Sequence, residues 1–157
     1  MENITKQEKA RALFMERGFN CAQAVAGAFA DEMGIDEAQI VKLASPFGGG
    51  FGRMREVCGA FSGMMMVLGA YCGYDDPSVK TAKPELYEKV RLLASRFEKE
   101  NGSIVCRELL GLKKGEVGGE PAERTPEFYR TRPCLKCIES AARLIEEFIN
   151  ECEAKKQ

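Results

Sequence analysis

Seven cysteines and the absence of histidine set the chemistry that this sequence can perform. Thiolates act as nucleophiles, as redox centres and as ligands for soft metals. Without histidine, a Ser-His-Asp triad, a Cys-His pair and every histidine-containing metal site are excluded. Five cysteines lie at or near a predicted helix start, where free N–H groups and the helix dipole favour the thiolate. These candidate catalytic residues are Cys21, Cys58, Cys106, Cys134 and Cys137.

The candidate cysteines also lie on or beside apolar stripes, so the helix starts that carry them could face inward and bring several sulfurs together. Cys134 and Cys137 form a CxxC pair on one helix face, which suits one disulfide or one metal. No strand precedes this pair, which argues against a thioredoxin motif, and no second close pair exists to complete a zinc knuckle. Cys72 and Cys152 lie at the ends of predicted helices and are expected to be incidental.

A glycine-rich segment, SPFGGGFGRMR, precedes Cys58. It lacks the Lys-Ser/Thr of a nucleotide-binding P-loop, and a helix rather than a strand comes before it. Its glycines allow close backbone approach, and the arginines that follow could hold an anion or a group of a redox partner. The candidate cofactor-binding residues are Gly48, Gly49, Gly50, Gly52 and Arg53. Arg53 and Arg55 also lead us to expect a lowered pKa for the Cys58 thiol.

Helical periodicity dominates the elements that must position these residues. Helices are expected over residues 3–17, 20–33, 36–44, 54–71, 84–99, 103–111 and 133–152. The 54–71 segment has no charged face, which indicates a central, buried helix. Residues 111–133 are expected to form a long polar loop, and no strand pattern is found. The prediction is an all-α, compact bundle of five to six helices, in which the glycine-rich loop leads into the buried helix and residues 1–157 form a single domain.

Composition narrows the setting of this chemistry. The chain has 157 residues, 45% of them hydrophobic, with 23 basic and 24 acidic side chains and a net charge of −1. Neither half is a charged arm, so no nucleic-acid partner is expected. The most apolar stretch, residues 59–73, is too short to span a membrane, and no secretory signal is visible, so we expect a cytoplasmic protein without a membrane partner. A reducing compartment favours redox or metal-binding cysteines over structural disulfides.

Residues 47–63, FGGGFGRMREVCGAFSG, resemble the "putative redox-active" family known by the signature C_GCAxxG_C_C. The upstream family cysteine matches Cys21 in NCAQAV, and the central one matches Cys58, which Gly59, Ala60 and Gly63 follow. The downstream family cysteines match Cys106 and Cys134. The resemblance covers about residues 5–150 and implies redox activity, without naming a substrate.

Three functional interpretations remain open at this point. In the first, a thiol-based oxidoreductase uses Cys58 as its central thiol, with Cys21, Cys106 or Cys134 resolving the mixed disulfide. In the second, a metal or iron–sulfur cluster is bound by Cys21, Cys58, Cys106 and Cys134, with Cys137 in reserve. In the third, the chain is a helical interaction module with inert cysteines. The expected partner is a redox protein or a small thiol. Both the cofactor and a homo-oligomeric state are left open.

Overall fold

Helices alone form the regular structure in the part of the chain that the computed structural model describes, residues 3–112 and 118–156. Six of them have eight or more residues, which confirms the predicted all-α bundle. They are α1 (Lys6–Met15), α2 (Cys21–Ala28), α4 (Glu37–Ala44), α6 (Gly59–Cys72), α7 (Ala82–Asn101) and α10 (Cys134–Lys155). Short helical turns complete the fold: α3 (Ala30–Met33), the 3-10 turn η1 (Ser45–Phe47), α5 (Gly48–Phe51), α8 (Cys106–Leu109) and α9 (Pro126–Thr131).

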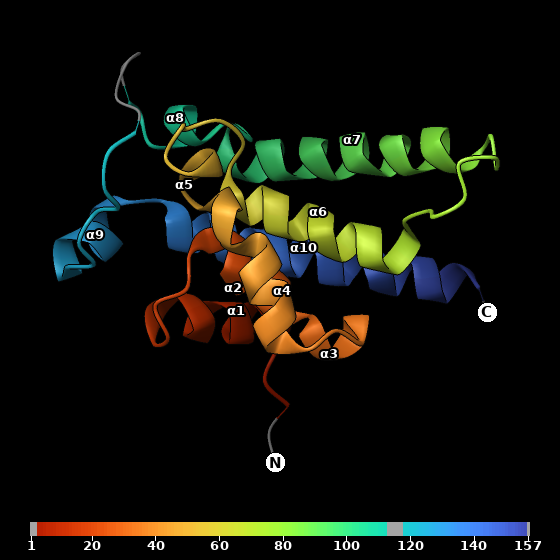
Figure 1. Ribbon diagram of the computed structural model, residues 1–157, viewed down its shortest axis with the longest axis horizontal. Coiled ribbons are helices and arrows are strands. Elements are labelled where there is room, and N and C mark those ends of the chain that lie inside the picture. Colours follow the sequence, from red (N-terminus) through yellow and green to blue (C-terminus); the bar gives the residue numbers. More distant parts are fainter. Residues whose placement is uncertain (1–2, 113–117, 157) are drawn as a thin grey trace.

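The long helices α6, α7 and α10 run along the long axis of the molecule, and α1 to α4 lie along one side of them (Figure 1). The helix α6 packs against α2, α7 and α10 and is central, as its lack of charged residues predicts. Gly63 of α6 faces the backbone of α2 so closely that a Cβ atom would lie 2.7 Å from the carbonyl oxygen of Ala22. The small residues of α6 therefore allow α2, itself buried over most of its length, to approach.

Side-chain caps fix where several helices begin. The Asn20 side chain accepts a hydrogen bond from the N–H of Gln23, and the Gln23 side chain accepts one from the N–H of Asn20. This reciprocal cap satisfies free N–H groups and sets Cys21 as the first residue of α2. Pro133 is the N-cap residue of α10, without a side-chain hydrogen bond, so Cys134 is the first residue of that helix.

The start of α6 differs from the sequence prediction. The helix begins at Gly59 rather than at residue 54, and Cys58 is its N-cap. Arg53 and Arg55 have φ angles of 65° and 59°, which no right-handed helix accepts. Val57 instead pairs with Val105 in an isolated antiparallel bridge.

The predicted loop 111–133 contains α9, a helix that the sequence prediction missed. Thr125 caps it by accepting a hydrogen bond from the N–H of Phe128, and Pro126 occupies its first turn. Tyr129 packs its ring edge-on against Phe14 of α1, with centroids 5.7 Å apart. Residues 113–117 of the predicted loop lie outside the described residues.

No helix in the described ranges is both long enough and apolar enough to cross a membrane.

Candidate functional site

The glycine-rich segment forms a single helical turn of left-handed sense. Five consecutive residues, 49 to 53, have φ angles between 58° and 68°. The N–H of Gly52 donates to the carbonyl of Gly48 over 2.9 Å, which closes the turn. Left-handed geometry costs about 1–2 kcal/mol for each residue with a side chain, so the glycines reduce the strain, while Phe51, Arg53 and Arg55 retain it. Such strain persists only where the surrounding structure enforces it.

A short backbone pairing joins the segment before α6 to the segment before α8. The N–H of Cys58 donates to the carbonyl of Ile104 over 2.7 Å, and the N–H of Cys106 donates to the carbonyl of Glu56 over 2.6 Å. These bonds set two of the candidate cysteines side by side, although 48 positions separate them in the sequence. Gly50 packs behind this pairing, where a Cβ atom would lie 2.6 Å from the Cβ of Cys106. Its φ of +65° and this close approach both require glycine.

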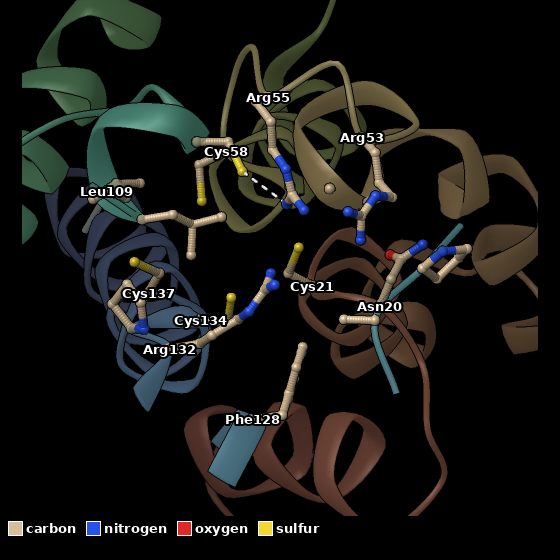
Figure 2. A pocket seen from close by; sticks show the side chains of 18 of the residues that line it. Asn20, Cys21, Arg53, Arg55, Cys58, Leu109, Phe128, Arg132, Cys134 and Cys137 are labelled. Atoms are coloured by element: carbon tan, nitrogen blue, oxygen red, sulfur yellow. Dashed lines mark hydrogen bonds between the residues drawn. The ribbon is translucent and has the colours of Figure 1, made fainter. Parts of the chain in front are cut away.

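A cavity of about 340 Å³ lies at the end of the molecule where α6 and α10 begin. Five cysteines from four separate segments line it: Cys21, Cys58, Cys106, Cys134 and Cys137. Figure 2 shows four of these side chains, those of Cys21, Cys58, Cys134 and Cys137, around one open space. Cys21 and Cys134 are half-buried, and the other three are buried. Cys72 and Cys152 are not among the lining residues.

The glycine residues predicted to bind a cofactor divide into two groups. Gly48, Gly49 and Gly52 line the cavity, together with Arg53. Gly50 does not line it but packs against Cys106, so its place in the structure is to position a cysteine.

Four arginines also line the cavity, and no aspartate or glutamate among the described residues does so. They are Arg53, Arg55, Arg124 and Arg132. The Arg55 guanidinium lies 3.7 Å, through Nη1, from the sulfur of Cys106. The Arg124 guanidinium donates to the carbonyls of Phe14 and Phe19 and stacks over the Phe14 ring. Arg53 and Arg55 are the arginines that the sequence predicts as able to hold an anion, and the structure adds Arg124 and Arg132 to the same cavity.

Burial contributes to a raised pKa at four of the cavity thiols, those of Cys21, Cys58, Cys106 and Cys134. Desolvation, with the nearby Cys58, raises the pKa of Cys21 to about 11, although the N–H of Gly49 opposes this shift. Burial and the neighbouring cysteines raise the pKa of Cys134 to about 12. Burial also raises the pKa of Cys106, and Arg55 offsets only part of the effect. A charged thiolate loses its hydration in such a site, and partial positive charges nearby do not replace all of it.

The expectation of a lowered pKa at Cys58 is wrong. A hydrogen bond with the Cys137 thiol and burial raise the pKa of Cys58 well above its ordinary value. The N–H groups of Ala60 and Phe61, at the start of α6, act in the opposite direction with a smaller effect. The N–H groups of the helix start lower the pKa as expected, but the Cys137 thiol and the burial of Cys58, which is 7% exposed, outweigh them.

Cys58, just before α6, and Cys137, the fourth residue of α10, line the same cavity, and the Cys137 thiol raises the pKa of Cys58. All seven cysteines are free thiols. Within residues 3–112 and 118–156, no three cysteine, aspartate or glutamate side chains are arranged to hold a single metal ion. The four cysteines expected as metal ligands therefore share a cavity without converging on one point.

The fold and the cavity define an all-α protein in which five thiols and four arginines line one cavity. Residues 19–148 match the family model described as "Putative redox-active protein (C_GCAxxG_C_C)". Because the match covers most of the chain, the protein belongs to this family. Neither the curated proteins nor the solved structures give a match.

Proposed function

We propose that the protein is a thiol–disulfide oxidoreductase in which Cys58 and Cys137 form the buried disulfide of the oxidised state. The observation that carries this proposal is that both buried thiols line one cavity with three further cysteines, where the Cys137 thiol raises the pKa of Cys58. Formation of this disulfide brings the two sulfurs to about 2 Å from each other. Family membership supports a redox role for the cysteines.

The first reaction with substrate falls to a more accessible thiol, because Cys58 and Cys137 are buried. Cys134 is half-buried and lies one helical turn from Cys137 on the same helix. The Cys134 thiolate attacks a disulfide R–S–S–R, and forms a mixed disulfide with one RS group while the other leaves as thiolate and takes up a proton.

Two intramolecular exchanges complete the reaction. The Cys137 thiolate attacks the Cys134 sulfur, which releases the second R–SH and joins Cys134 to Cys137. Cys58 then attacks the Cys137 sulfur, which frees the Cys134 thiol and leaves the Cys58–Cys137 disulfide. In total, two protein thiols lose two electrons and two protons, and one substrate disulfide becomes two thiols. The raised pKa values of Cys58 and Cys134 make these exchanges slow at neutral pH and faster in alkaline solution.

The test is a thiol count with disulfide mapping. The protein is purified under anaerobic conditions, reduced, freed of reductant and treated with bis(2-hydroxyethyl) disulfide, and its cross-links are identified by peptide mass. We expect the loss of two thiols and a Cys58–Cys137 cross-link. A matched control, Cys152→Ser, alters a thiol outside the cavity and should give the same cross-link.

Two results would contradict the proposal. One is an unchanged thiol count after this treatment, or a cross-link that omits both Cys58 and Cys137. The other is bound iron with acid-labile sulfide in the anaerobically purified protein, with absorption lost when Cys21, Cys58, Cys106 or Cys134 is replaced. That result would assign the cavity to an iron–sulfur centre.

A further inference from the structure

The Arg55 side chain is a buried charge that forms no ion pair with any carboxylate of residues 3–112 and 118–156. It is only 4% exposed, and its Nε atom has no hydrogen-bond partner among the described residues. Its nearest polar contact is the Cys106 sulfur, 3.7 Å from Nη1. Because burial raises the pKa of Cys106, that sulfur is a neutral thiol at neutral pH and does not balance the charge. A buried charge without a partner is strongly unfavourable, so an anion placed beside Arg55 would stabilise it.

Two further guanidinium groups surround the same space. Figure 2 shows Arg53, Arg55 and Arg132 pointing toward the region around the Cys21 sulfur. Burial lowers the pKa of Arg53, and the positive charges of Arg55 and Arg132 lower it further. None of the three forms an ion pair with a carboxylate within the described ranges.

The backbone reinforces this arrangement. Arg53 and Arg55 both occupy left-handed conformations that side chains rarely adopt. The Arg53 Nε donates to the carbonyl of Gly118 over 2.9 Å, and Arg132 lies over the Phe128 ring at 4.8 Å, so both side chains are held in place. Backbone strain at two of these three arginines is typical of a functional site, where the surrounding structure enforces it.

We propose that Arg53, Arg55 and Arg132 form a binding site for the anionic group of a small molecule inside the thiol cavity. A volume of about 340 Å³ suits a small molecule. Resting on the proposed redox function, we further assign the substrate class as a small disulfide that carries carboxylate groups. The guanidinium groups bind the carboxylate by charge-assisted hydrogen bonds, and the sulfur atoms of the ligand then lie among the cavity cysteines.

The first experiment tests the anion site without using the redox reaction. The reduced protein is alkylated with iodoacetate, which is anionic, and in parallel with iodoacetamide, which is neutral. The rate at each cysteine is measured by peptide mass. Both reagents attack the same thiolate, so the ratio of the two rates removes the effects of pKa and burial and reports the local potential. We expect this ratio at Cys21 to be about tenfold higher than in the Arg55→Gln variant.

Matched variants separate charge from folding. Arg53→Gln should lower the ratio in the same direction, and Arg55→Lys, which retains the charge, should preserve most of it. Arg96→Gln removes an arginine that pairs with Glu151 outside the cavity, so it should leave the ratio at Cys21 unchanged. Urea denaturation verifies that each variant is folded. An unchanged ratio in folded Arg55→Gln and Arg53→Gln would overturn the anion site.

The second experiment tests the substrate class. The reduced protein is oxidised with dithiodiglycolate, which carries two carboxylates, and with cystamine, which carries two amines. We expect oxidation by dithiodiglycolate to be at least about tenfold faster, and Arg55→Gln to remove most of the difference. Oxidation by both compounds at equal rates would refute the assigned substrate class and leave the redox function standing. Oxidation by neither compound, with a high iodoacetate ratio, would refute the redox function and leave the anion site standing.

Discussion

The contact between α2 and α6 gives a prediction that two glycines of one helix can test. In Gly63→Ala, the new Cβ atom would lie 2.7 Å from the Ala22 carbonyl oxygen and 3.0 Å from the Val25 Cβ. The first neighbour is backbone and cannot move without shifting α2. In Gly69→Ala, on the exposed side of the same helix, nothing lies within 4 Å of the new atom.

The two variants share the gain in helix propensity, about 1 kcal/mol for replacing glycine by alanine. Only Gly63→Ala adds overpacking, which costs about 1–3 kcal/mol. We therefore expect Gly69→Ala to raise the free energy of unfolding. The free energy of unfolding of Gly63→Ala should be about 1–3 kcal/mol lower than that of Gly69→Ala. For a chain of this size the difference corresponds to about 2–12 °C in Tm.

The assay is urea denaturation of the reduced wild type and both variants, followed by circular dichroism. Thermal scans provide a second measurement. If Gly63→Ala is as stable as Gly69→Ala, then α2 does not pack against α6 as closely as described. The same displacement of α2 should increase the alkylation of Cys21, because Ala22 follows it directly.

Three other predictions concern stability. In reduced protein the free energy of unfolding should fall as the pH rises from about 9 toward 11 and 12, because the raised pKa values of Cys21 and Cys134 mean that the unfolded chain loses these protons first. Urea titrations at each pH should show a shallower fall in the free energy of unfolding for the double variant that carries Cys21→Ser and Cys134→Ser. Asn20→Ala removes the cap of α2 and should cost about 1 kcal/mol by urea denaturation; no loss would mean that the cap does not hold α2. Phe97→Ala, at a fully buried position, should cost about 3–5 kcal/mol, whereas Leu92→Ala, 42% exposed on the same helix, should cost less than about 1 kcal/mol; equal losses would contradict the assigned burial.

Local signals explain which elements could be predicted from the sequence. Asn20 with Gln23, and Gly34 after α3, are caps whose chemistry is visible in the residue types, and they mark the ends that the structure has. The beginning of α6 could not be predicted in the same way. Residues such as Arg53 and Arg55 rarely adopt positive φ, and the Val57–Val105 pair joins two valines far apart in sequence.

The candidate site shows the same division. The five cysteines could be singled out because each lies near a predicted helix start, and the structure gathers them around one cavity. The convergence of the arginines depends on left-handed backbone and on a helix, α9, inside an expected loop. The sign of the pKa shift at Cys58 depends on burial, which the sequence indicated only through Val57 and Phe61 beside it.

The distance in sequence between the cysteines of the cavity connects oxidation to folding. A bond between Cys58 and Cys137 would close a loop of about 80 residues, and such a closure removes about 4–5 kcal/mol of chain entropy from the unfolded state. Oxidation and unfolding then form one thermodynamic cycle. The free energy of forming this disulfide is therefore more favourable in the folded chain than in the unfolded chain, by the same amount. Under oxidising conditions the bond would enclose α6, α7, α8 and α9, which all lie within the loop. Its lifetime against unfolding would therefore follow the redox state of its surroundings.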